Sequence, residues 1–158
     1  MTLRLEPMGT LVIHVDESWN FMNGPVSGRS CSAFREVVWE SPLLRARSVW
    51  ANGSYRNGPE VAEPNIRVMF RTDEGVMIYL DYLVRVHLPS HTLPVGTPGK
   101  SPAIMSGRLE VDDADSRFSW LNRTQVVGDG TLDLVAMTQS YDMHVLRWPG
   151  DGGPIAQS

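Results

Sequence analysis

Residues 65–87, NIRVMFRTDEGVMIYLDYLVRVH, carry the clearest structural signal in the chain. Apolar and polar residues alternate on both sides of Asp73-Glu74-Gly75, and a period of two is that of a β-strand. Glycine tolerates the left-handed backbone conformation that a tight hairpin needs. The stretch therefore predicts two antiparallel strands, Asn65–Thr72 and Val76–His87, joined by a turn at Gly75.

Similar patterns extend in both directions from this hairpin. Strands are predicted at 11–16, 33–40, 43–50, 104–111, 121–127 and 131–146. A tight turn is predicted at Gly128-Asp129-Gly130, one helical turn within 114–120, and a long loop at 89–102. About eight to ten antiparallel strands with almost no helix predict an all-β fold.

The strand pattern favours a closed barrel or a β-sandwich over any α/β fold. Of the two, we expect a single antiparallel β-barrel, lipocalin-like. A barrel of about eight strands has room for one small ligand, so a central pocket is expected. The 158 residues suit one domain, which we expect to span residues 1–148, followed by a flexible Gly/Pro-rich tail at 149–158.

Composition excludes several classes of function. The net charge is −4 and no Lys/Arg cluster is present, which argues against nucleic-acid binding. No long apolar run predicts a membrane span, so a cytoplasmic location is expected. Four scattered histidines give no metal-ligand spacing, and no nucleotide-binding motif is present. We therefore expect neither a metal nor a cofactor.

The basic residues are almost all of one type. Thirteen are arginines and only Lys100 is a lysine. One interpretation is codon bias in a GC-rich genome. The other is that one or two arginines bind an anionic substrate, since the planar guanidinium suits carboxylates.

Several motifs resemble those of domain-of-unknown-function family 3237, which comprises small bacterial and fungal β-barrel proteins. They are Gly28-Arg29 through Glu40-Ser41-Pro42, Leu44-x-Ala46, Asn52-Gly53-Ser54-Tyr55, Asn65-Ile66-Arg67, Thr72-Asp73-Glu74-Gly75-Val76-x-Ile78, Phe118-x-Trp120-Leu121-Asn122-Arg123 and Tyr141-x-Met143-x-Val145. The resemblance implies the barrel fold. It also implies cofactor-free lyase or isomerase chemistry on phenolic or similar small molecules.

The chain departs from the family pattern at three places. Glu36-Val37 replaces a Gly-Gly pair, and Tyr55 stands where the family usually has Trp. Asn52 to Tyr55 and Asn65 to Val68 also lack the family's characteristic aspartates, whereas Arg67 is kept. The chain is therefore a divergent member of the pattern it resembles.

Arg67 is the first candidate for chemistry. Asn65, Arg67 and Met69 share one face of their strand, and the family pattern of polar residues there suggests that this face lines the barrel. A buried arginine needs an anionic partner. The partner is either an internal acid such as Glu36 or a substrate carboxylate or phenolate.

Two tyrosines and Glu36 are the candidates for proton transfer. Tyr82 shares an interior-like face with Ile78, Leu80 and Val84, and a phenol can donate to a developing oxyanion. Tyr55 is the second candidate. Glu36 is a reserve base if burial raises its pKa. The alternatives are packed tyrosines and a surface carboxylate.

Other residues are candidate walls of the pocket. Aromatic and methionine side chains suit a flat ligand, although simple core packing is the favoured interpretation of each residue taken alone. The predicted substrate-binding residues are Asn65, Met69, Phe34, Trp39, Trp50 and His14.

These features predict a cofactor-independent lyase or isomerase. Its substrate is a small aromatic or apolar molecule with a carboxylate, carbonyl or phenol. Arg67 binds the substrate, while Tyr55 or Tyr82 moves the proton. The alternatives are a non-catalytic small-molecule carrier or sensor, and a structural protein with a filled barrel. A homodimer is compatible with the fold.

Overall fold

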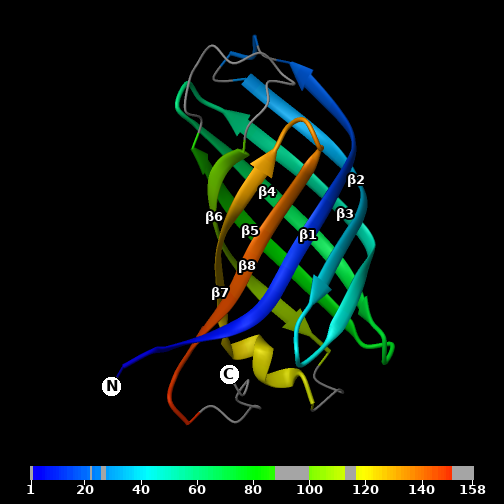
Figure 1. Cartoon of the computed structure of the whole chain (residues 1–158), viewed down its shortest axis with the longest axis vertical. Helices are drawn as coiled ribbons and strands as arrows, with labels where there is room; N and C mark the ends of the chain where they lie inside the picture. The colour runs from blue at the N-terminus through cyan, green and yellow to red at the C-terminus, as the bar shows by residue number, and fades with distance from the viewer. Residues whose placement is uncertain (1, 22, 26–27, 88–99, 113–116, 151–158) are drawn as a thin grey trace.

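The computed structural model describes residues 2–21, 23–25, 28–87, 100–112 and 117–150. Within them the chain forms eight antiparallel strands and a short 3-10 helix (Figure 1). The elements are β1 (Arg4–Phe21), β2 (Gly28–Glu40), β3 (Arg45–Asn57), β4 (Val61–Thr72), β5 (Met77–His87), β6 (Lys100–Val111), η1 (Ser119–Arg123), β7 (Gln125–Asp133) and β8 (Thr138–Arg147).

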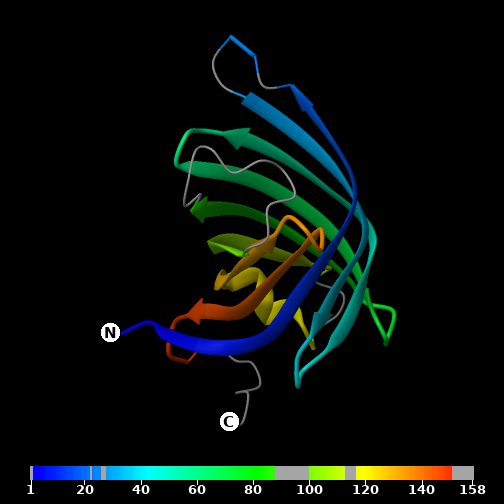
Figure 2. The ribbon, with the colours of Figure 1, turned by 45° about the horizontal axis from the view of Figure 1, so that its top comes forward.

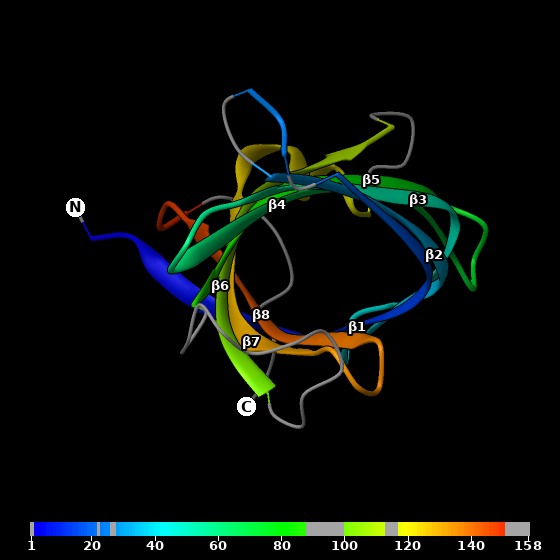
Figure 3. The same ribbon diagram turned by 90° about the horizontal axis from the view of Figure 1, so that it is seen from above.

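The strands form one closed barrel. Each strand pairs with its neighbours in the chain, and β1 also pairs with β8. Figure 3, which looks down the barrel, shows the ring that results. We call the end that holds η1 the lower end, as it is drawn in Figure 1; the turns β3–β4 and β7–β8 lie at the opposite, upper end. Figure 2 shows the barrel with its upper end turned toward the viewer. The predicted all-β barrel is confirmed.

The decisive hairpin forms as predicted. Gly75 has φ 88°, and its N–H donates to the carbonyl of Thr72 at 2.9 Å. The side-chain oxygen of Thr72 also accepts a hydrogen bond from the N–H of Val76. A left-handed glycine therefore reverses the chain between β4 and β5.

The turn predicted at Gly128-Asp129-Gly130 is wrong. These residues lie inside β7, and the chain reverses at residues 134–137 instead. A Cβ atom on Gly130 would lie 1.9 Å from the carbonyl oxygen of Ser140. The glycine therefore allows β8 to approach closely and does not mark a turn. Most of the predicted loop at 89–102 and part of the predicted helical turn at 114–120 fall outside the described residues.

The lower half of the barrel is filled with apolar side chains. Trp39 is fully buried, donates from Nε1 to the carbonyl of Met8 at 2.7 Å, and packs edge-on against Phe70 at 5.9 Å. The side chains around it are also almost fully buried, including Leu80 and Val145. This half is a packed apolar core. At its lower end the buried Arg147 pairs with Glu6 at 3.1 Å, and within the described residues Nη1 of Arg147 and Nε1 of Trp120 have no hydrogen-bond partner.

The helix η1 covers the lower end. Trp120 and Leu121 are buried there. The side-chain amide of Asn122 accepts from the N–H of Val111 at 2.7 Å and donates to its carbonyl at 2.9 Å. The asparagine therefore continues the hydrogen bonding of β6 where no strand follows, which gives the Trp-Leu-Asn segment a structural role.

No helix in the described part of the chain is long and apolar enough to span a membrane.

A contrast between two glycines tests this account of the fold. Gly9 has φ 83°, and an added Cβ would lie 1.9 Å from the carbonyl oxygen of Glu40. Gly75 has a similar φ of 88°, but a Cβ there meets nothing within 4 Å. We expect Gly9→Ala to lower the free energy of unfolding by about 3 kcal/mol or more, and Gly75→Ala by only about 1 kcal/mol. Urea unfolding monitored by circular dichroism measures both, and equal losses would contradict the close packing at Gly9.

Candidate functional site

Three tyrosines converge in the upper half of the barrel interior. Tyr55 comes from β3, Tyr82 from β5 and Tyr141 from β8, and all three lie on the inward faces of their strands. The rings of Tyr82 and Tyr141 pack edge to face with centroids 6.1 Å apart. Three strands that are distant in sequence therefore place three phenols in one region.

A carboxamide connects two of these phenols. The hydroxyl of Tyr141 donates to Oε1 of Gln139 at 2.8 Å, and Nε2 of Gln139 donates to the hydroxyl of Tyr55 at 3.3 Å. Gln139 is only 1% exposed, so both of its polar ends have partners inside the barrel. This chain of hydrogen bonds fixes the orientation of two phenols.

Small polar side chains continue the site toward the upper end. The side-chain amide of Asn57 donates to Oγ of Ser30 at 2.7 Å, and the hydroxyls of Ser18 and Ser32 lie 2.6 Å apart. Ser18 is exposed, whereas Ser30 and Ser32 are buried. The polar interior therefore reaches solvent at the upper end. Among the described inward-facing side chains of this half, none is charged.

The third phenol has no partner. Within the described part of the chain, the buried hydroxyl of Tyr82 makes no hydrogen bond. Burying a hydroxyl without a partner costs about 1–3 kcal/mol in proteins. Such a group is unusual enough to require an explanation.

Burial also sets the protonation state of the phenols. Removal from water raises the pKa of Tyr82 well above its ordinary value, and the neighbouring phenols Tyr141 and Tyr55 add to the effect. Burial likewise raises the pKa of Tyr55 and of Tyr141. A phenol of ordinary pKa is already protonated at neutral pH, and burial keeps all three phenols protonated to higher pH.

Three of the predicted site residues lie at or near this site. Tyr55 and Tyr82 face the interior, as expected for Tyr82 from its strand pattern. Phe34 is half-buried beside Gly53, where an added Cβ would lie 2.7 Å from the phenylalanine ring. Trp39 also faces the interior, but in the filled lower half.

The predicted orientation of β4 is wrong. Ile66, Val68 and Phe70 face the interior with no exposed surface, so Asn65, Arg67 and Met69 face outward. Burying a guanidinium costs several kcal/mol, whereas burying an aliphatic or aromatic side chain stabilises the fold by about 2 kcal/mol each. The alternation therefore favours the apolar face, and Arg67 does not line the barrel.

Glu36, Trp50 and His14 also lie outside the barrel interior. Glu36 forms an ion pair with Arg47 and not with Arg67, so the proposed internal salt bridge is absent. Trp50 is 48% exposed because an irregularity between Ser48 and Trp50 shifts the alternation of β3. His14 is half-buried on the outward face of β1, opposite Glu36 of β2. None of the three lines the expected central pocket.

Two residues of the site were missed by the sequence analysis. Gln139 and Tyr141 alternate with Ser140 and Asp142 and precede the apolar Met143 and Val145 on the same face. The period of two would have placed both of them inside the barrel. The pattern was present in the sequence. The predicted strand 131–146 spanned the true turn at 134–137, so its residues were not assigned to an inward or an outward face.

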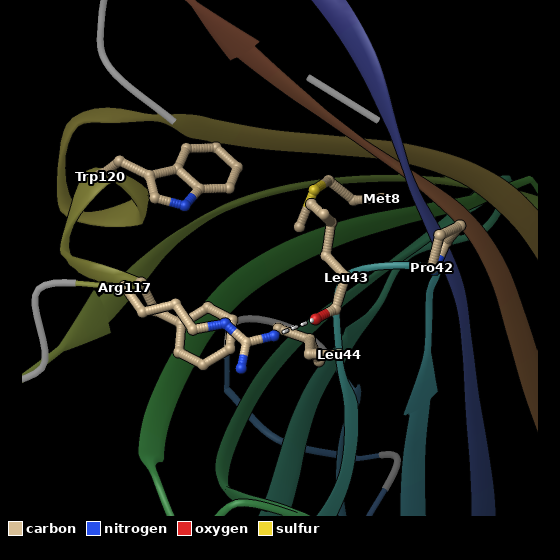
Figure 4. A pocket seen from close by; sticks show the side chains of 7 residues that line it. Met8, Pro42, Leu43, Leu44, Arg117 and Trp120 are labelled. Atoms are coloured by element: carbon tan, nitrogen blue, oxygen red, sulfur yellow. Dashed lines mark hydrogen bonds between the residues drawn. The ribbon is translucent and has the colours of Figure 1, made fainter. Parts of the chain in front are cut away.

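A pocket lies at the lower end of the barrel. It has a volume of about 190 Å³ and is lined by Met8, Pro42, Leu43, Leu44, Arg117, Phe118 and Trp120 (Figure 4). Arg117 closes one side, where its guanidinium donates to the carbonyl of Leu43 at 3.3 Å and contacts the ring of Phe118. Across the described residues, no group of three or more His, Cys, Asp or Glu side chains is placed to hold a metal ion.

Comparison with known families identifies the fold's relatives. Residues 3–145 match the model of a family described as a protein of unknown function, DUF3237. The chain belongs to this family. The resemblance drawn from its motifs is thereby confirmed. No curated protein matches the chain by sequence.

Solved structures share the barrel at low sequence identity. A conserved protein of unknown function from Rhodopseudomonas palustris superposes with a TM-score of 0.78 at 16% identity, covering 92% of this chain and 99% of that one. A β-barrel-like protein from Acinetobacter baumannii gives 0.73 at 20% identity, covering 93% and 98%. A protein from Penicillium herquei described as an enzyme gives 0.67 at 10% identity, covering 92% and 96%. These identities show a common fold alone.

Two tyrosine variants test the hydrogen bonding of the site. We expect Tyr82→Phe to raise the free energy of unfolding by about 1 kcal/mol, because it removes a buried hydroxyl without a partner. Tyr141→Phe should lower it by about 1–2 kcal/mol, because Oε1 of Gln139 loses its donor. Chemical denaturation of both variants measures the difference. A loss of stability in Tyr82→Phe as large as that in Tyr141→Phe would show that the Tyr82 hydroxyl has a partner.

The raised pKa values predict an alkaline limit to stability. In the unfolded chain the phenols lose their protons at a pKa of about 10, whereas the folded protein holds them to higher pH. The unfolded state therefore binds fewer protons above pH 10, and the free energy of unfolding should fall as the pH rises beyond that value. Phenolate absorption at alkaline pH should appear together with unfolding, and Tyr82→Phe should reduce the slope. Phenolate formation by all three tyrosines in a fully folded barrel at pH 10 would contradict this.

Proposed function

We propose that the protein is a cofactor-independent lyase or isomerase that acts on a small aromatic or apolar carbonyl or phenol compound. The substrate would bind in the upper half of the barrel, among Tyr55, Tyr82 and Tyr141. One observation carries the proposal: a buried phenol without a hydrogen-bond partner lies beside two further phenols, in a half of the interior whose described inward-facing side chains are uncharged.

The free hydroxyl of Tyr82 supports a ligand that offers an oxygen atom. An unpartnered buried donor destabilises the folded protein, and a bound oxygen would remove that cost. The edge-to-face packing on Tyr141 restricts the Tyr82 ring, so the hydroxyl is held in place before a ligand arrives. A fixed donor loses little conformational entropy on binding.

The protonation state supports stabilisation of an oxyanion. When a bond next to a carbonyl breaks or moves in a lyase or isomerase step, negative charge collects on the carbonyl oxygen. A protonated phenol in a desolvated site stabilises that charge without rearranging, and this is often the largest single contribution to catalysis. The hydroxyl of Tyr55, which accepts from Nε2 of Gln139, would be the second donor, through its own proton.

The same geometry narrows the chemical class of the substrate. The expectation of a substrate carboxylate depended on Arg67 in the interior, and Arg67 lies on the outer face. An ionised carboxylate in an uncharged interior would be poorly solvated. A neutral carbonyl or phenol oxygen fits the unpartnered Tyr82 hydroxyl better, and Phe34 offers a half-buried aromatic wall beside Gly53.

The neighbour from Penicillium herquei is described as an enzyme, so at least one barrel of this fold is assigned a catalytic activity. That likeness is at the level of the fold and gives no substrate for this chain. The choice of reaction class therefore depends on the phenols and on the family resemblance.

A panel of aromatic ketones, enones and phenols tests the proposal. Binding is measured by thermal shift and by tryptophan fluorescence, and each ligand that binds is then followed for turnover by absorbance. We expect Tyr82→Phe to lower kcat by about 100-fold or more, as loss of one oxyanion donor does elsewhere. Tyr79→Phe is the matched control, because Tyr79 lies on the outward face of the same strand.

The outcomes separate the candidate functions. Equal turnover in Tyr82→Phe and the wild-type protein would remove the assignment of the site. Saturable binding without turnover of any ligand would contradict an enzyme and support the carrier or sensor. No binding by any member of the panel, with the interior phenols unchanged on addition of ligand, would support a filled structural barrel.

A further inference from the structure

A second pocket lies on the outer surface of the barrel. It has a volume of about 480 Å³ and extends across β2, β3, β4 and β5. Its lining residues are Arg29, Ser54, Tyr55, Arg56, Glu63, Asn65, Arg67, Leu83, Val84 and Arg85. Eight of these ten residues belong to the outward faces of their strands; Tyr55 and Val84 lie between outward-facing neighbours.

Four adjacent strands each contribute one arginine to this outer pocket. The residues are Arg29 of β2, Arg56 of β3, Arg67 of β4 and Arg85 of β5. The strand register places Arg29 directly opposite Arg56. Like charges that face each other across two antiparallel strands are destabilising. The sheet therefore brings positive charges together against their mutual repulsion.

The acidic residues nearby neutralise only part of this charge, although the register places Glu63 opposite Arg56. Glu63 is the only carboxylate among the lining residues, and it pairs with Arg85 at 2.9 Å. Asp81, which lies opposite Arg67 in the register, contacts Arg108 at 3.4 Å instead. Within the described residues, the structure records no ion pair for Arg29, Arg56 or Arg67.

This arrangement contrasts with the rest of β3 and with the whole chain. Lower on the same strand, Arg45 and Arg47 each pair with a glutamate of β2. The chain as a whole carries a net charge of −4. An excess of positive charge in one outer pocket is therefore a local feature and not the consequence of a basic surface.

We propose that this outer pocket binds a small polyanion, meaning a molecule that carries two or more phosphate or carboxylate groups. Guanidinium groups present planar, paired donors that match both kinds of oxyanion. Ser54 and Asn65 add uncharged hydrogen-bonding groups, and Leu83, which is 56% exposed, offers an apolar contact for the carbon part of the ligand. The volume lies in the usual range for a small-molecule site.

The site is separate from the tyrosine site in the interior. Tyr55 borders both sites, but the four arginines lie on the outward faces of β2–β5 and the phenol side chains on inward faces, so the sheet stands between the arginines and the phenols. Binding of a polyanion outside therefore does not depend on the proposed reaction inside. The two proposals fail or succeed independently.

Two probes at low ionic strength test the proposal by isothermal titration calorimetry. Inorganic pyrophosphate represents the phosphate class and citrate the carboxylate class. We expect one saturable site per chain for at least one probe. Arg56→Gln and Arg67→Gln should each weaken binding about tenfold or more, because each removes charge-assisted hydrogen bonds. Added salt should weaken it further.

Arg71→Gln is the matched control. Arg71 is exposed on the same outward face of β4 as Arg67 but does not line the pocket. The control should bind within about twofold of wild type, and Tyr82→Phe should also leave binding unchanged. The probe that binds more tightly identifies phosphate or carboxylate as the natural group. No saturable binding of either probe, or equal weakening in Arg71→Gln, would overturn the proposal. Circular dichroism of each variant confirms that the barrel is intact.

Discussion

The pairing of β1 with both β2 and β8 is the constraint on which the rest of the molecule depends. It closes the sheet, so every strand has a partner on each side and every residue faces either the interior or the solvent. Because side chains alternate along a strand, closure fixes the environment of each one. A local irregularity in a strand therefore changes which of its side chains face the interior. A single shift between Ser48 and Trp50 turns Trp50 outward and leaves Gly53 and Tyr55 facing the interior.

The interior of the closed barrel has two parts that differ in the polarity of their side chains. The lower half is a dense apolar core around Trp39 and Phe70, and it supplies the hydrophobic stabilisation that holds the barrel together. The upper half carries phenols, a carboxamide and small hydroxyl groups. Its polar groups are mostly satisfied by one another, with Tyr82 as the exception.

The fold places the arginines in two kinds of surroundings. Some form ordinary surface ion pairs, such as Arg45 with Glu40, which contribute little to stability. Others gather on the outer face of β2–β5, where the register sets like charges side by side. Arg67 belongs to this second group. The sequence analysis placed Arg67 inside the barrel, whereas the ligand that we propose for it would bind outside.

The sequence by itself determined the all-β class, the hairpin at Gly75 and the inward position of Tyr82, because these depend on local alternation and on the conformational freedom of glycine. It also contained the correct face of β4. The apolar residues Ile66, Val68 and Phe70 outweigh the family's preference for a polar residue at Arg67, since hydrophobic burial is favourable and burial of a guanidinium is costly. Only the tertiary structure decided which polar groups meet. Gln139 and Tyr55 are 84 residues apart, and nothing local in either segment encodes their hydrogen bond. Their contact follows from closure of the barrel, which sets the register of all eight strands at once.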